Sequence, residues 1–218
     1  PKTSSAASDV YKRQEEGVSV KGQNGELVCT KPFPSMPIGF WNDDDSSKYT
    51  SAYFKEFEGV WTHGDYLEIT VNGGAIIYGR SDTTLNPGGV RIGTAEIYRS
   101  IENFEEVLDS VVVGRPEGSD VSIVLCLKLI DRISITKDLE DKIKAQIRKS
   151  TTPRHVPNYI FQVSDIPYTI SGKKVEKAVL HAILGKSVKN KDALINPDSL
   201  REFSNFCLLY TSDAADDV

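Results

Sequence analysis

Short runs that alternate apolar and polar residues characterise the first part of the chain. Such runs, rich in β-branched and aromatic residues, occur at 27–30, 66–70 and 75–78 between glycine and proline clusters, a pattern typical of strands. Asn-Gly-Gly at 72–74 separates the last two runs and favours a hairpin, because these residues tolerate positive φ. The pattern predicts a small antiparallel β subdomain over 15–80.

The apolar period lengthens beyond position 80. Apolar residues three and four positions apart predict amphipathic helices, and continuous apolar runs predict buried strands. Leu139, Ile143 and Ile147, for example, form one stripe. The expected helices cover 93–104, 136–150 and 173–186, and the expected strands cover 109–115, 122–131 and 159–166. Residues 81–206 are therefore predicted to form a compact α+β domain.

The two ends, 1–14 and 207–218, lack either period. We expect both to be disordered tails, because no packed element is predicted there. Their sequences also resemble translated adapter sequence, so they are interpreted as non-native and set aside from the fold.

Charge and hydropathy exclude several classes of protein. The 218 residues carry a net charge of −5, with acids and bases mixed along the chain, so no basic face for nucleic acid is expected. No apolar run approaches the roughly 20 residues that cross a bilayer, and the start lacks a signal-peptide pattern. Neither a membrane partner nor export is therefore expected.

The cysteines indicate a compartment. Cys29, Cys126 and Cys207 are an odd set without a C-x-x-C pair, which favours neither a disulfide framework nor a zinc site. We therefore expect a reducing environment and a cytosolic location.

Candidate chemistry begins with an aspartate and two arginines. Asp65 follows a glycine at a strand, where its carboxylate could accept hydrogen bonds from vicinal hydroxyls or serve only in a turn. Arg80 and Arg91 flank Asn-Pro-Gly-Gly at 86–89, so their guanidiniums could bind phosphate. The alternative is a solvent loop whose arginines pair with nearby acids.

A lysine pair in Ser-Gly-Lys-Lys, 171–174, is the other candidate. Lys173 is predicted in the first turn of a helix, where a cation opposes the helix dipole. An anionic ligand there would relieve the mismatch, whereas the alternative is a plain surface charge. A nucleoside-triphosphate P-loop is excluded, because the segment has a single glycine.

Three stretches, read together and in order, resemble the adenylate-forming acyl-CoA synthetases: GVWTHGDY, YGRSDTTLNPGGVRIGTAEIY and IPYTISGKKVE. The resemblance covers most of 15–206. It implies the C-terminal piece of a longer enzyme, with the end of a large N-terminal domain up to about residue 80, then a hinge and a small mobile domain. The phosphate loop and the acyl pocket of the family would lie upstream, so this chain alone is not expected to be active.

The resemblance also implies roles in handling Mg-ATP. Asp65 would bind the ribose hydroxyls, Arg80 would hold the nucleotide and Arg91 would reach its phosphates. Lys173 would be the catalytic residue that bridges the substrate carboxylate and the α-phosphate, and Asp82 would be the hinge. Metal ligands do not transfer clearly and stay unassigned.

Residues implied to contact CoA form a separate group. Gly88 and Gly89 would let the pantetheine arm approach the backbone, and Arg148 would contact the CoA phosphates. Lys174 is interpreted as a plain surface charge, and His63, which replaces a more usual threonine, is given no catalytic role.

Substrate class is left with three alternatives. Residues 25–54 and the lysine motif are most similar to the family members that act on acetoacetate. Members that act on acetate or propionate would share the nucleotide residues, and a non-catalytic interaction module would keep only the fold. The expected partners are these small molecules and the missing N-terminal portion of the same enzyme.

Overall fold

The computed structural model describes residues 8–11, 19–188 and 190–213, with side chains from 19 to 188 and from 190 to 206. The chain divides into two compact units, Pro1–Asp82 and Thr83–Val218. Each unit has its own sheet. The α+β class predicted from the sequence is confirmed.

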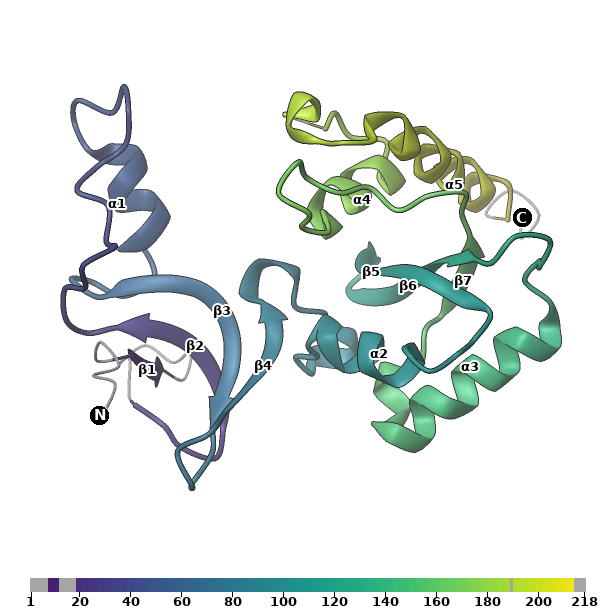
Figure 1. The fold of residues 1–218 in the computed structure, drawn as a ribbon, viewed down its shortest axis with the longest axis horizontal. Coiled ribbons are helices and arrows are strands. Elements are labelled where there is room, and N and C mark those ends of the chain that lie inside the picture. The colour runs from purple at the N-terminus through teal and green to yellow at the C-terminus, as the bar shows by residue number, and fades with distance from the viewer. Residues whose placement is uncertain (1–7, 12–18, 189, 214–218) are drawn as a thin grey trace. The chain divides into compact units, whose positions relative to one another are not determined.

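A four-stranded antiparallel sheet forms the first unit (Figure 1), in the order β1-β2-β3-β4. Its strands are β1 (Ser8–Tyr11), β2 (Asn24–Cys29), β3 (Trp61–Ile69) and β4 (Ala75–Arg80). The predicted hairpin joins β3 to β4: the Thr70 amide donates to the Gly74 carbonyl over 2.8 Å, and Gly73 has φ of 82°. A two-residue period thus located three of the four strands.

Trp61 organises the small core of this unit. Its side chain is 6% exposed and stacks on Tyr53 with ring centroids 3.7 Å apart. Tyr53 ends helix α1 (Ser47–Tyr53), and Phe33 meets the same indole edge-on at 5.4 Å. Aromatic packing of this kind fixes α1 against β3.

The second unit is built on a three-stranded mixed sheet, in the order β5-β6-β7. Strand β5 (Val107–Glu117) runs antiparallel to β6 (Asp120–Leu129), and β6 runs parallel to β7 (Tyr159–Gln162). Helices α2 (Thr94–Ile101) and α3 (Lys137–Ser150) cover one face, and α4 (Glu176–Ile183) and α5 (Leu200–Asp213) cover the other (Figure 1).

Alternation along the strands explains the two layers. Val111 and Val113 of β5 pack under α4 and α5, whereas Val112 between them packs toward α2 and α3. Successive side chains of a strand point to opposite faces, so a continuous apolar run supplies both cores. The stripe of Ile143 and Ile147, both 0% exposed, buries α3 on its face.

Five short 3₁₀ turns connect these elements within the described residues. They are η1 (Ser81–Thr83), η2 (Pro87–Gly89), η3 (Pro153–His155), η4 (Lys191–Ala193) and η5 (Pro197–Ser199). Helix α4 begins at Glu176, later than the predicted start at 173. No helix of the described part of the chain is long and apolar enough to cross a membrane.

Two elements lie where the sequence predicted tails. Strand β1 falls within 1–14, and helical backbone of α5 continues through 207–213. Strand β1 pairs through its backbone with β2, and such pairing needs no side-chain period. Helix α5 was missed although Leu200, Phe203 and Phe206, spaced by three, are buried on the sheet.

Candidate functional site

Asp65 and Arg80 face each other on adjacent strands of the first unit. They are register partners of β3 and β4, and Arg80 Nη1 donates to Asp65 Oδ1 over 3.1 Å and to the His63 carbonyl over 3.1 Å. His63 Nδ1 lies 2.8 Å from the other carboxylate oxygen, Asp65 Oδ2. Both oxygens of Asp65 are therefore oriented, and each keeps a further lone pair for a ligand.

Gly64 makes this pairing possible. Its φ is 83°, and a Cβ at this position would lie 2.6 Å from Arg80 Nη2. Any side chain would therefore displace the guanidinium from Asp65. Asp82 is the next acid along, with Oδ1 3.8 Å from Arg80 Nε, so the alternative of an arginine paired to a nearby acid holds in part for Arg80.

Residues 86–89 of the second unit, here called the glycine loop, are held by contacts to their backbone. The Gly88 amide donates to Asp120 Oδ1 over 2.7 Å, and the Gly88 carbonyl accepts from Arg154 Nη1 over 3.2 Å. The amide hydrogen bonds from Gly88 and Val121 hold the pKa of Asp120 below its usual value. Gly89, with φ of 77°, has open space within 4 Å of an added Cβ.

The base of this loop is apolar and paired. Leu85 and Ile92 exchange two backbone hydrogen bonds of 2.9 Å, and each side chain is 1% exposed. Beyond the loop, the Gly93 amide donates to Glu96 Oε2 over 3.1 Å at the start of α2. The loop is thus anchored on both sides while its tip stays accessible.

Glu96 also faces a buried histidine. His155 Nε2 lies 3.5 Å from Glu96 Oε1, and His155 Nδ1 lies 2.9 Å from Thr152 Oγ1. Burial alone would raise the pKa of Glu96, but His155 and the Gly93 amide outweigh burial and hold that pKa below its usual value. The carboxylate is therefore ionised at neutral pH.

Arg91 and Arg148 differ in their exposure to solvent. Arg91 lies half-buried between the glycine loop and α2, whereas Arg148 is exposed on the last turn of α3. Among the described residues, no hydrogen bond or ion pair reaches the Arg148 guanidinium. Arg154, which the sequence did not single out, contacts the Gly88 carbonyl.

Lys173 lies in a tight turn and not in a helix. The Thr169 amide donates to the Lys173 carbonyl over 2.9 Å, and the Lys173 amide donates to Thr169 Oγ1 over 3.0 Å. Gly172 has φ of 75°, and Val175 before α4 is not helical. The argument from the helix dipole was therefore wrong, because the glycine turns the chain before the helix begins.

The two lysines have opposite environments. Lys173 is exposed, and its ammonium has no hydrogen bond or ion pair to the described residues. The Lys174 Nζ lies 2.7 Å from Asp109 Oδ1, donates to the Ser110 carbonyl over 2.7 Å and lies 4.6 Å from the Tyr98 ring centroid. Lys174 is thus not the plain surface charge that the sequence predicted.

Metal-binding and cysteine chemistry add little to the site. Among the described residues no group of three His, Cys, Asp or Glu could hold a metal ion. Cys29 and Cys126 are free, and burial raises the pKa of the Cys126 thiol. Cys207 lies outside the residues with described side chains.

No protein-family model matches the chain. Its fold occurs in a benzoate CoA ligase of Burkholderia xenovorans, at 26% identity and a TM-score of 0.61, over 77% of this chain and 32% of that one. In fold and in part of its sequence, the chain is therefore similar to a CoA ligase.

A more specific likeness comes from higher identities. The acetoacetyl-CoA synthetase of Streptomyces lividans matches with a TM-score of 0.82 and 37% identity, over 91% of this chain and 30% of that one. The acetoacetyl-CoA synthetases of Rhizobium meliloti and Xenopus tropicalis are 52% and 51% identical over 198 and 193 residues. These matches cover 91% and 88% of this chain. The chain is a homologue of the acetoacetyl-CoA synthetases and spans about 30% of their length.

Proposed function

We propose that the chain is the C-terminal part of an acetoacetate–CoA ligase. The whole enzyme would convert acetoacetate, ATP and CoA into acetoacetyl-CoA, AMP and pyrophosphate. The observation that carries the proposal is a single exposed cation, Lys173, on a hydrogen-bonded turn in a chain 52% identical to an acetoacetyl-CoA synthetase. The chain holds only one part of the machinery, so the missing N-terminal portion supplies the rest.

Lys173 acts in the first half-reaction. A carboxylate oxygen of the substrate attacks the α-phosphorus of Mg-ATP, and pyrophosphate leaves. Two anions must approach each other, and a cation between them removes their repulsion and fixes the line of attack. The absence of a partner for Lys173 among the described residues leaves its ammonium available for this task. Mg²⁺ enters with ATP as part of the substrate, and no ligand residue is assigned to it.

The nucleotide is held by residues of the first two of the three stretches, GVWTHGDY and YGRSDTTLNPGGVRIGTAEIY. Asp65 accepts hydrogen bonds from the ribose hydroxyls, Arg80 holds the nucleotide beside it, and Arg91 reaches the phosphates. The pairing of Asp65 with His63 and Arg80 supports this role, because it orients the carboxylate before a ligand arrives.

CoA uses the glycine loop in the second half-reaction. The thiol sulfur attacks the carbonyl carbon of the acyl-adenylate, and AMP leaves. The open space at Gly89 supports approach of the pantetheine arm beside Gly88, and the exposed Arg148 is proposed to contact the CoA phosphates. Asp82 is the proposed hinge, and the division between the two units directly after it supports that role.

Other readings have less support. The relatives named above are acetoacetyl-CoA synthetases, which disfavours an acetate or propionate ligase and a non-catalytic module. The free Cys29 and Cys126 support the proposed cytosolic location.

The substrate assignment is tested on the full-length protein that contains this chain. Pyrophosphate release is measured with ATP and saturating acetoacetate, acetate or propionate, in separate reactions. We expect release with acetoacetate to exceed the other two by at least about 10-fold, because a polar group read by the pocket discriminates strongly. Equal rates for all three acids, or no release with any of them, would contradict the proposal.

A further inference from the structure

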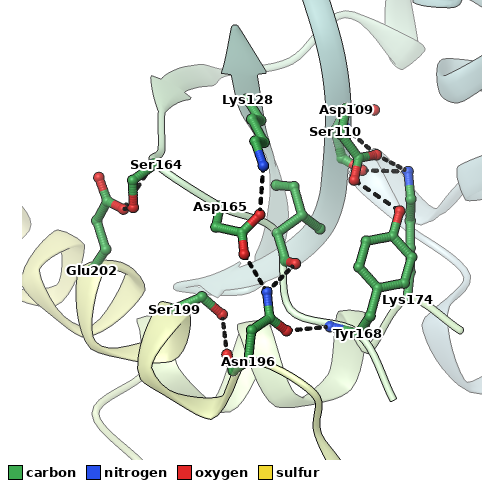
Figure 2. Close-up of polar contacts among 11 residues, drawn as sticks. Asp109, Ser110, Lys128, Ser164, Asp165, Tyr168, Lys174, Asn196, Ser199 and Glu202 are labelled. Atoms are coloured by element: carbon green, nitrogen blue, oxygen red, sulfur yellow. Dashed lines mark hydrogen bonds and ion pairs between the residues drawn. The ribbon is translucent and has the colours of Figure 1, made fainter. Parts of the chain in front are cut away.

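The turn that carries Lys173 has both of its legs tied to one carboxylate (Figure 2). Tyr168 and Lys174 pair as an antiparallel bridge at the base of the turn. The Tyr168 hydroxyl donates to Asp109 Oδ2 over 2.8 Å, and Lys174 Nζ lies 2.7 Å from Asp109 Oδ1. Asp109 of β5 therefore joins the two strands of the turn to the central sheet.

Asp109 is itself fixed, and so is Lys174. The Ser110 amide donates to Asp109 Oδ1 over 2.7 Å, and the Ser110 carbonyl accepts from Lys174 over 2.7 Å. Burial and the bond to Asp109 raise the pKa of Tyr168, so the phenol stays protonated and continues to donate. Every donor and acceptor of this cluster thus favours one arrangement.

The segment that leads into the turn is held separately (Figure 2). The Asn196 side chain accepts from the Tyr168 amide over 3.0 Å and donates to the Ile166 carbonyl over 2.9 Å. It also donates to Asp165, whose carboxylate lies 2.8 Å from Lys128 Nζ. The approach to the turn is therefore fixed independently of Asp109.

The bond between Asp109 and Lys174 also determines the direction of the Lys173 side chain. Neighbouring residues beside a bridge of this kind point to opposite sides, and Lys174 points inward to Asp109. Lys173 must then point outward, as its exposure shows. A slip of one residue would exchange the two lysines, and Asp109 opposes that slip while neutralising the second cation.

We propose that Asp109, with Tyr168, is a positioning residue that selects which of the two lysines is presented to the reacting carboxylate and phosphate. The proposal rests on the function proposed for Lys173. Asp109 touches no substrate, so its removal acts on adenylation through the direction of Lys173 alone. Thioester formation from a supplied acyl-adenylate does not need Lys173 and is unaffected.

The test uses Tyr168→Phe and Asp109→Asn in the full-length protein, each alone and combined with Lys173→Ala. Pyrophosphate release reports adenylation, and acetoacetyl-CoA formation from supplied acetoacetyl-adenylate reports the second step. Tyr159→Phe is the matched control, because it removes a tyrosine hydroxyl bond to Glu117, 3.3 Å long, elsewhere in the same unit. Tyr168→Phe removes one oxygen only, so it gives a result even where Asp109→Asn fails to fold.

We expect Tyr168→Phe and Asp109→Asn to slow adenylation by about 10- to 100-fold, the usual cost of a misplaced group. Thioester formation stays within about 2-fold, and Tyr159→Phe changes neither step by more than about 2-fold. In the Lys173→Ala background both substitutions lose their effect on adenylation, because coupled residues are not additive.

Two outcomes overturn the proposal separately. If Lys173→Ala slows adenylation but Tyr168→Phe and Asp109→Asn do not, or if they slow both backgrounds equally, Asp109 has no positioning role and the proposed function stands. If Lys173→Ala itself leaves adenylation unchanged, the role of Lys173 is wrong and the positioning role falls with it.

Discussion

The turn that carries Lys173 and the loop that carries Gly88 are both fixed by charged residues, but through different parts of the chain. Asp109 binds the side chains of Tyr168 and Lys174, and the neighbouring ammonium of Lys173 stays exposed. Asp120 and Arg154 instead bind the backbone of Gly88.

This difference suits two kinds of chemistry. A turn held by side chains can present one free cation in a fixed direction, which is what stabilisation of a phosphate requires. A loop held by its backbone needs no side chain of its own, so a bulky ligand can approach the glycines closely. Under the proposed function, Lys173 would serve adenylation and Gly88 would serve thioester formation.

Lys173→Ala is the largest expected break in this comparison. Adenylation by the full-length protein should fall by about 100- to 1000-fold, the usual loss when one electrostatic group is removed from a transition state. Thioester formation from supplied acetoacetyl-adenylate should stay within about 3-fold, because the cation is not needed there. Lys142→Ala is the control, since it removes an exposed lysine whose ion pair with Asp138 lies on the surface. Equal loss of both steps in Lys173→Ala would contradict separate roles for the turn that carries Lys173 and the loop that carries Gly88.

Gly88→Ala should impair the second half-reaction, thioester formation. Its Cβ would lie 2.7 Å from Arg154 Nη1, so the guanidinium must leave the Gly88 carbonyl and the loop loses one anchor. Thioester formation should slow by about 10-fold or more, since small misplacements are costly, while adenylation stays near the wild-type rate. Gly118→Ala has a comparable φ of 61° and open space around it, and separates backbone strain from the clash. A loss of the same size in Gly118→Ala would show that strain alone is responsible.

Gly64→Ala sharpens the comparison with a similar clash in the first unit. The added Cβ would lie 2.6 Å from Arg80 Nη2 and displace Arg80 from Asp65. The KM for ATP should rise by about 10-fold, because a hydrogen bond to a charged group contributes roughly 1.5–3 kcal/mol. Gly73→Ala, with φ of 82° and nothing within 4 Å, should leave that KM unchanged. An ATP KM that rises equally in both variants would contradict an effect through Arg80.

Glu96→Gln gives the smallest expected effect and concerns the support of the glycine loop. The pKa of Glu96 is lowered on folding, so its contribution to stability is present above its unfolded value of about 4.3 and is lost as the pH falls. Urea unfolding of this chain should show a deficit of about 1 kcal/mol for Glu96→Gln at pH 7, which shrinks as the pH falls below about 4. A deficit that grows on acidification would show that the sign is wrong.

Local pattern predicted most of the elements but not the details of the site. The hairpin after β3 and the helices α2 and α3 follow from residues within a few positions of each other. Lys173 and Lys174 are chemically identical neighbours, and the contacts that distinguish them, such as the pairing of Lys174 with Asp109, come from residues far away in sequence. The sequence therefore located the lysine pair but misread Lys174.

The anchors of the glycine loop were missed for the same reason. Asp120 and Arg154 lie 32 and 66 positions from Gly88, and neither belongs to a short motif. Asp65 and Arg80 were singled out because each lies in a motif, whereas their contact depends on the register of β3 and β4. Periodicity reports burial, whereas contacts across the fold depend on how the elements pair.

The most direct test measures both half-reactions on Lys173→Ala and Gly88→Ala of the full-length protein, side by side. Adenylation is followed by pyrophosphate release, and thioester formation by acetoacetyl-CoA made from supplied acetoacetyl-adenylate. The separate roles of the turn and the loop predict opposite losses: Lys173→Ala loses adenylation and keeps thioester formation, and Gly88→Ala does the reverse. If both variants lose the same half-reaction, the separate roles of the lysine turn and the glycine loop are contradicted.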